Sequence, residues 1–372
     1  MYKKFFMGIA AMAALTLVSC SSDDLNSLSD NSSKNEAISF DGYLGRSAVS
    51  VNGTRGSVVD INALKSTDTD KKGFGVFGYY NTTDHSATEQ SFNANLFNNE
   101  QVTCPKDGTN WTYTPLKYWP AQGHIDFLAY APYENGKTLK ENSSSIDFTV
   151  SETIANQTDL LWANAENKTK DNLTENKVKF QFNHALSRLG YSVKLKDASY
   201  ESVATITLNK ITLAGSPDGT KNAFYTKGTI DLAKPTSDAN LWASPDPTDS
   251  KQKFEWFSGE NKQLSDKTLS SEDAKAIKNS NNEYLFVIPQ DFSKTVPNAD
   301  QLYVIVEYTI QYSGGTAKPK VSYKVNKKLN EKFLQGKAYT INLTIGLTPI
   351  EFNADVTDWD PTDGTPIDTP LE

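Results

Sequence analysis

One cysteine near the start of the chain stands in a context that is typical of covalent modification. Lys3 and Lys4 are followed by a short apolar run from Phe5 to Val18, and Cys20 comes directly after Ser19. A charged start, an apolar run of this length and small residues before a cysteine are the order of a bacterial lipoprotein signal. We therefore expect residues 1–19 to be removed and the Cys20 thiol to carry the lipid. The alternative is an ordinary signal peptide with a chance cysteine.

A second chemical feature is the placement of arginine. Only three of the 37 basic residues are Arg, and two of them, Arg46 and Arg55, lie within ten residues of each other near the N-terminus. Both stand among Gly, Ser, Asn and Thr, a composition that suits an exposed loop open to proteolysis. The third, Arg188, falls at the start of the predicted second domain and is expected to be folded and protected. Arg46 and Arg55 are thus candidate sites for an Arg-specific protease, unless their pairing is chance.

Motifs for catalysis are missing from the sequence. There is no Gly-x-Ser-x-Gly elbow, no phosphate-binding loop, no dinucleotide fingerprint and no His-Glu-x-x-His. The three histidines, His85, His124 and His184, are interpreted as structural. We expect no catalytic residue, no metal site and no cofactor. A carboxylate pair for glycoside hydrolysis stays open, because 45 acidic residues make many pairs conceivable.

Composition narrows the class of protein further. The 372 residues are 37% hydrophobic and 11% aromatic, which is enough to bury a core. The formal charge is −8, and loss of Lys3 and Lys4 with the signal takes it to −10. A chain this acidic lacks the basic surface of a nucleic-acid binder. If Cys20 is lipidated, Cys104 is left alone and an internal disulfide is excluded.

Short strands between polar turns dominate the pattern. Alternating or apolar runs predict strands at 178–182, 191–195, 206–213, 284–288, 302–312, 321–325 and 339–345. Only residues 270–278 and 327–333 are predicted as short helices. The expected fold is all-β, with two tandem sandwich domains. The expected division is a signal peptide at 1–19, a lipidated tether with a removable strand at 20–55, and sandwiches at 56–180 and 181–372.

Several segments in order resemble one family. They are residues 111–120 (WTYTPLKYWP), 125–132 (IDFLAYAP), 182–189 (FNHALSRL), 336–343 (GKAYTINL) and 356–359 (VTDW). Together with the lipoprotein signal, they resemble the fimbrillins, the subunits of type V pili, and their anchor-type relatives. The resemblance covers about residues 38–360.

The resemblance implies a fold and a mode of assembly. Fimbrillins are transthyretin-like double sandwiches that are exported as lipoproteins and cut by an Arg-specific protease, which removes the first strand. A strand of a neighbouring subunit then fills the groove. Here Ile38-Ser39-Phe40 is the candidate removable strand, and Arg55 in Gly53-Thr54-Arg55-Gly56 is favoured over Arg46. The expected donor region carries Tyr339, Ile341, Leu343, Ile345, Ile350, Phe352, Val356 and Trp359.

The implied partners are other fimbrial subunits, the outer membrane through the lipid, an Arg-specific protease, and receptors or glycans on host or bacterial surfaces. The implied role is that of a stalk, tip or anchor subunit of a surface fimbria that supports adhesion. The alternative is a monomeric surface lipoprotein that binds glycans on exposed Trp111 and Trp119. Alternating aromatics of this kind are more often core residues.

Overall fold

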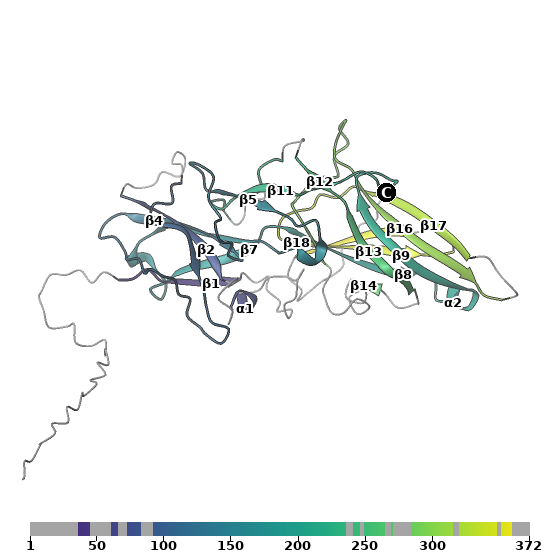
Figure 1. Ribbon diagram of the computed structural model, residues 1–372, viewed down its shortest axis with the longest axis horizontal. Helices are drawn as coiled ribbons and strands as arrows, with labels where there is room; N and C mark the ends of the chain where they lie inside the picture. The colour runs from purple at the N-terminus through teal and green to yellow at the C-terminus, as the bar shows by residue number, and fades with distance from the viewer. Residues whose placement is uncertain are drawn as a thin grey trace, which may run out of the picture. The chain divides into compact units, whose positions relative to one another are not determined.

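The computed structural model describes residues 36–44, 61–65, 73–82, 92–235, 241–245, 249–264, 269–270, 284–314, 320–347 and 351–358. These residues are almost entirely in strands and loops (Figure 1), which confirms the all-β prediction. The helices in this part of the chain are single turns. They are α1 (Ile61–Leu64), α2 (Tyr200–Val203) and two 3-10 turns, η1 (Ile154–Asn156) and η2 (Lys170–Asn172).

The N-terminal strands form one six-stranded sheet. In spatial order it contains β1 (Phe40–Leu44), β7 (Val178–His184), β6 (Leu161–Lys168), β4 (His124–Ala131), β2 (Phe74–Asn81) and β3 (Phe97–Val102). Neighbouring strands are antiparallel except for β1 and β7, which are parallel. The first strand of the chain therefore lies at one edge of this sheet.

Both faces of the six-stranded sheet are buried around its middle. All eight residues of β4 are buried, and its six apolar residues divide between two apolar clusters. Ile125, Phe127 and Ala129 belong to a cluster with Phe40 and Phe180, while Leu128 and Tyr130 belong to another with Trp162. Because successive side chains of a strand point to opposite faces, such a strand reads as a continuous apolar run.

The C-terminal strands form two further sheets that share one core. The four-stranded sheet has the order β13 (Phe254–Gln263), β9 (Ala204–Ala214), β16 (Leu302–Tyr312) and β17 (Lys320–Leu329). The second sheet has the order β14 (Leu269–Ser270), β8 (Ser187–Leu195), β18 (Lys337–Ile345) and β19 (Glu351–Asp358), and β15 (Leu285–Val287) also pairs with β8. Inward side chains of both sheets, such as Leu208, Val306 and Ile341, form one cluster. This is the layered packing of a β-sandwich.

Short strands connect the two sets of sheets. β5 (Ser145–Thr149) pairs with β11 (Lys227–Asp231), and β10 (Phe224–Tyr225) pairs with β12 (Lys251–Gln252). An apolar cluster joins Phe77 and Trp162 of the six-stranded sheet to Ile230 and Phe286. The main-chain N–H of Phe286 also donates to the Gln157 side chain at 2.8 Å. β7 ends at His184 and β8 begins at Ser187, while the division into domains at residues 180 and 181 stays a prediction.

The strand predictions agree with the structure, and one helix prediction is wrong. Residues 302–312 form β16 with the bounds predicted. Residues 327–329, predicted as part of a helix, are instead the end of β17, where Lys327 lies opposite Val304. The long cross-strand pairing with β16 overrides the local preference of this Lys- and Asn-rich stretch. The other predicted helix, at 270–278, lies outside the described residues apart from Ser270, which is in β14.

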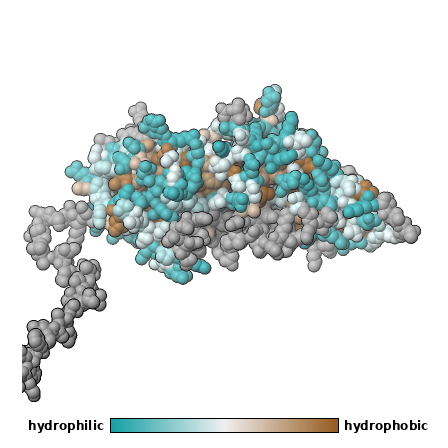
Figure 2. Space-filling model, viewed as in Figure 1, coloured by the Kyte–Doolittle hydropathy of each residue, from teal (hydrophilic) through white to brown (hydrophobic). Residues whose placement is uncertain are grey.

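Figure 2 shows a largely hydrophilic face on which hydrophobic areas are small and scattered. Among the described residues, no helix combines the length and the apolar character that crossing a membrane requires. The apolar side chains are thus gathered in the interior clusters.

Phe40→Ala tests how much β1 contributes to the fold. The Phe40 side chain is 1% exposed, so its truncation leaves a cavity, and we expect a loss of about 3–5 kcal/mol in the free energy of unfolding. Tyr43→Ala on the same strand is the matched control, because Tyr43 is 46% exposed and its loss should change stability by less than about 0.5 kcal/mol. Urea unfolding of chains begun at Ser21 measures both. Equal midpoints for the two variants would contradict the packing described.

Candidate functional site

The N-terminal segment 36–44 is held by two other segments of the chain. β1 lies parallel to β7, with Phe40 opposite Val178 and Leu44 opposite Phe182 (Figure 1). Before β1, the main-chain N–H of Ile38 donates to the Lys117 carbonyl at 2.8 Å, and Trp119 N–H donates to the Glu36 carbonyl at 3.0 Å. The segment thus runs in a groove between β7 and residues 117–119. Removing it would leave backbone groups unpaired on both sides.

Phe40 anchors β1 in the interior. Its ring lies 5.4 Å from those of Phe97, Tyr113 and Phe127 and 5.7 Å from that of Phe180, measured between centroids. Such edge-to-face and offset arrangements are the favoured geometries of aromatic pairs. The pocket that Phe40 fills is therefore shaped by aromatic rings that belong to other strands and loops.

The next inward position of β1 is narrow. Gly42 is buried, and a Cβ at this position would lie 3.1 Å from Phe182 Cε2, 3.4 Å from Phe74 Cε1 and 3.5 Å from Ile61 Cδ1. A methyl group fits there only if the ring of Phe182 shifts slightly, and a larger side chain does not fit. On the outward face, Asp41 Oδ1 accepts a hydrogen bond from the Gly42 N–H at 2.9 Å. The groove accordingly has a wide aromatic pocket followed, two residues on, by a constriction.

Three of the four aromatic residues in segment 111–120 line this groove, while Tyr118 is exposed. Trp111, Tyr113 and Trp119 are at most 8% exposed and lie in the same apolar cluster as Phe40. The Tyr113 hydroxyl also donates to the Ile38 carbonyl at 2.8 Å. The expectation that these aromatics are core residues is correct. The glycan-binding alternative loses its predicted platform, because Trp111 and Trp119 are not exposed.

The candidate lipidation site and the two candidate cleavage sites are located only by their positions in the sequence. Cys20, Arg46 and Arg55 lie outside the described residues, but Arg46 follows the end of β1 by two residues and Arg55 precedes α1 by six. The third arginine is folded into β8, where the Arg188 guanidinium lies 4.5 Å from the centre of the Tyr284 ring. A cut after either of the first two arginines would separate β1 from the rest of the chain.

The predicted donor residues fall on two strands with different surroundings. Tyr339, Ile341, Leu343 and Ile345 lie on β18, which pairs with β8 on one side and β19 on the other, and they are at most 3% exposed. Phe352 and Val356 lie on β19, opposite Leu343 and Tyr339. In the order of this sheet, β19 is the edge strand. Ile350 and Trp359 lie outside the described residues. An edge strand can leave without opening the sheet, and an interior strand cannot.

The Tyr339 hydroxyl is hydrogen-bonded on both sides within this end of the fold. It accepts a hydrogen bond from the Leu334 N–H at 2.8 Å and donates to the Lys332 carbonyl at 3.0 Å. Burial raises the pKa of Tyr339 to about 12. This hydroxyl therefore stays neutral and structural through the physiological range, and it fixes the loop before β18.

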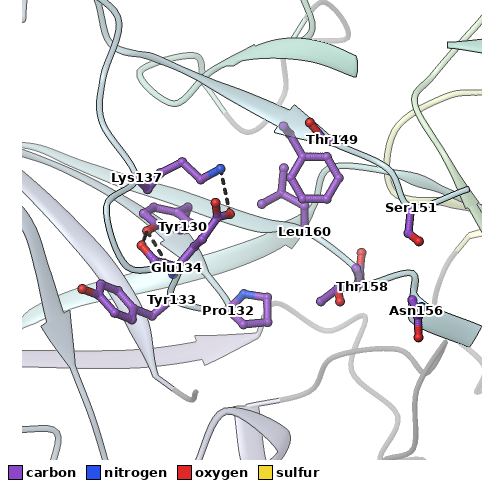
Figure 3. Close-up of a pocket in the computed structure, with 12 residues that line it drawn as sticks. Tyr130, Pro132, Tyr133, Glu134, Lys137, Thr149, Ser151, Asn156, Thr158 and Leu160 are labelled. Carbon is purple, nitrogen blue, oxygen red and sulfur yellow. Dashed lines mark hydrogen bonds and ion pairs between the residues drawn. The ribbon is translucent and has the colours of Figure 1, made fainter. Parts of the chain in front are cut away.

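A separate pocket of about 390 Å³ is lined by residues near η1 and β5 (Figure 3). The Lys137 ammonium in its lining lies 2.7 Å from the Glu134 carboxylate. The Tyr130 hydroxyl donates a hydrogen bond to the main-chain carbonyl of Glu134 at 3.0 Å. The other acid, Asp159, is 0% exposed and lies 2.6 Å from His184 Nδ1. The pocket thus presents no exposed carboxylate pair of the kind that glycoside hydrolysis needs.

The histidines of the described residues are buried. His124 and His184 are each 4% exposed, which agrees with the structural interpretation, and His85 lies outside the described residues. Within the described part of the chain, no group of three or more His, Cys, Asp or Glu side chains is arranged to hold a metal ion. Cys104 is a free, buried cysteine whose pKa is raised, mainly by burial.

Comparison with known proteins gives the family. A model described as "Fimbrillin-like" matches residues 62–359, and the chain belongs to this family. A fimbrial protein from Bacteroides vulgatus has a similar structure, with a TM-score of 0.62, 21% identity, and coverage of 87% of this chain and 100% of that one. A putative cell adhesion protein from Bacteroides ovatus (TM-score 0.47, 17% identity) covers 88% of this chain and 99% of its own. No match was found among curated proteins.

A third similar structure is the tip fimbrial protein from Porphyromonas gingivalis, with a TM-score of 0.35 and 11% identity, covering 77% of this chain and 93% of that one. Membership of a fimbrial family supports a structural role at the cell surface rather than a catalytic one.

Sequence reasoning missed part of the groove. The removable strand was predicted only as Ile38–Phe40, whereas β1 continues to Leu44. The alternation Phe40, Gly42, Leu44 carries the missing signal, and glycine at an inward position obscured it. The contribution of β7 and residues 117–119 had no local signal, because these partners lie far along the chain.

The raised pKa of Tyr339 predicts a stability change at high pH. In the unfolded chain this tyrosine ionises near pH 10, and in the folded chain near pH 12, so its contribution is complete below pH 10 and is lost as pH rises through 12. Within that window each pH unit should lower the folding equilibrium constant by at most about tenfold through this group. Urea unfolding at pH 9, 10, 11 and 12 measures it.

Tyr339→Phe is the matched variant. It should lose about 1–2 kcal/mol at neutral pH, because the Leu334 N–H loses its acceptor, and it should show a shallower decline between pH 10 and 12. An unchanged slope in this variant would contradict the assignment.

Proposed function

We propose that this protein is a subunit of a surface fimbria that is exported as a lipoprotein, cut after Arg55 or Arg46, and assembled by strand exchange. The observation that carries the proposal is the position of β1. It is a parallel edge strand that fills an aromatic core, and two of the three arginines follow its last residue by two and eleven positions. Family membership supports assembly with other fimbrial subunits.

A cut at either arginine would have two effects. It would separate the subunit body from Cys20 and its lipid, and it would turn β1 from a part of the chain into a bound peptide. A tethered strand is held at a high effective concentration, which is lost once the covalent link is broken. Another strand of suitable shape can then compete for the groove.

β19 of a neighbouring subunit is the proposed competitor. It is an edge strand, so it can leave its own sheet with the loss of one ladder of hydrogen bonds, the one with β18. β18 with Tyr339 and Ile341 is interior and is proposed to stay in place. Each added subunit presents a new groove and a new strand, so the contact is head-to-tail and builds a filament.

The proposed location follows from the same steps. The precursor is anchored in the outer membrane by the lipid on Cys20, and the processed subunit is part of a surface appendage that supports adhesion. The proposed partners are other copies or other fimbrial subunits and an Arg-specific protease. The role as stalk, tip or anchor then depends on whether β19 is released.

The double variant Arg46→Ala with Arg55→Ala tests the processing step. A chain begun at Ser21 is treated with an Arg-specific protease, followed by intact mass measurement and an unboiled gel. The unmodified chain should be cut once or twice before residue 56 and then form a ladder of multimers. The double variant should stay full-length and monomeric, because Arg188 is folded into β8.

Each single variant and Arg188→Lys serve as controls. Arg55→Ala alone should slow cutting more than Arg46→Ala alone, and Arg188→Lys should behave like the unmodified chain. A normal ladder from the double variant would overturn the proposal.

A further inference from the structure

The C-terminal edge strand repeats the sequence pattern of the strand that it is proposed to replace. Aligned without gaps, Ile350-Glu-Phe352-Asn-Ala354-Asp-Val356 matches Ile38-Ser-Phe40-Asp-Gly42-Tyr-Leu44. Ile and Phe are identical, Asn stands for Asp, Ala for Gly, and Val for Leu. The correspondence joins two segments whose strands, β1 and β19, lie in different sheets.

We propose that β19 of a second copy of this chain enters the groove parallel to β7, in the register of β1, with Phe352 at the position of Phe40 and Ala354 at that of Gly42. This inference rests on the proposed function, because the groove is open only once β1 has been released. It makes Phe352 and Ala354 the specificity-determining residues of the donor. It also makes the chain its own partner.

The aromatic pocket is the first argument for this register. Four rings surround Phe40, three of them with centroids at 5.4 Å, so the pocket fits a six-membered ring. Within β19 the only aromatic residue is Phe352. A shift of two residues would put Ile350 or Ala354 in this pocket, and a smaller side chain leaves part of an aromatic cavity unfilled, which is destabilising.

The constriction at Gly42 is the second argument. If a strand puts a phenylalanine in the aromatic pocket, the residue two positions later must lie beside Phe182. A Cβ at that position already lies 3.1 Å from the Phe182 ring. In β19 that residue is Ala354, the smallest side chain after glycine. A shift of two residues in either direction would place Phe352 or Val356 in the constriction, which has no room for them.

The outward face agrees with the same register. Asp41 Oδ1 accepts a hydrogen bond from the Gly42 N–H, and the side-chain oxygen of Asn353 can accept the same bond from Ala354 N–H. The side of β19 that would face the groove already faces a core in its own sheet, where Ala354 is 4% exposed and Val356 packs against the apolar cluster. The same side of the strand is apolar in both settings.

A disulfide across the new interface tests the register. Tyr43 lies opposite Gln181, so Asp355, which takes its place, should lie opposite Gln181 of the next subunit. Directly paired residues of neighbouring strands are close enough for a disulfide, and a shift of two residues adds about 6.6 Å. Chains begun at Ser21 and carrying Asp355→Cys are cut with the protease and mixed with cut chains carrying Gln181→Cys. Lys179→Cys replaces Gln181→Cys in the matched off-register control.

We expect a ladder on unboiled gels in all mixtures, and a cross-linked dimer on non-reducing denaturing gels only with Gln181→Cys. Cys104 is buried and should not take part. A ladder whose cross-link forms with Lys179→Cys, or with neither, would overturn the register and leave assembly by strand exchange standing. The absence of any ladder would overturn the proposed function and the register together.

A peptide in trans tests the constriction without changing the folded chain. A peptide of residues 348–360 should block the ladder of cut, unmodified chains. The same peptide with Ala354→Leu should be at least tenfold weaker, while Ala354→Gly should retain its effect. Asp355→Leu, which takes the exposed position of Tyr43, is the size-matched control and should also retain it. Equal inhibition by the Ala354→Leu peptide would contradict the proposed fit at the constriction.

Discussion

The insertion of Phe40 into an aromatic pocket is the interaction on which the rest of the N-terminal sheet depends. The ring completes a cluster formed by residues of β3, β4 and β7 and by the segment that contains Tyr113. The strand that carries it is nevertheless at the edge of the sheet and near the start of the chain. A central part of the core is therefore supplied by an edge strand that is paired on one side only, with β7.

This arrangement accounts for the proposal that β1, and not an interior strand, is the one exchanged. β4 is buried on both faces and paired on both sides, so its loss would divide the sheet. β1 has one ladder partner, β7, and the residues just before it, Glu36 and Ile38, make backbone hydrogen bonds to residues 117–119. Its removal leaves a five-stranded sheet with a defined groove. Any strand that fills the same pocket and fits beside the same constriction can then make the stabilising contacts that β1 makes.

Local sequence patterns predicted the parts of the fold that depend on local preference. A mostly apolar run predicted β16 with its observed bounds, and Trp111, Tyr113 and Trp119 were correctly interpreted as core. The helix predicted at Lys327–Phe333 failed because pairing with β16 decides that segment. The parallel pairing of β1 with β7 joins segments more than 130 residues apart, and no local pattern encodes it. The constriction at Gly42 likewise depends on Phe74, Phe182 and Ile61.

Competition between β1 and a neighbour's strand for one groove is the central claim, and native mass spectrometry of the cut protein tests it most directly. Cutting leaves the N-terminal peptide with β1 bound to each monomer. If exchange displaces it, a dimer retains one such peptide and a trimer also retains one, because only the terminal groove is still filled by β1. Multimers that retain one peptide for every subunit would show that association uses another surface, and they would contradict the account.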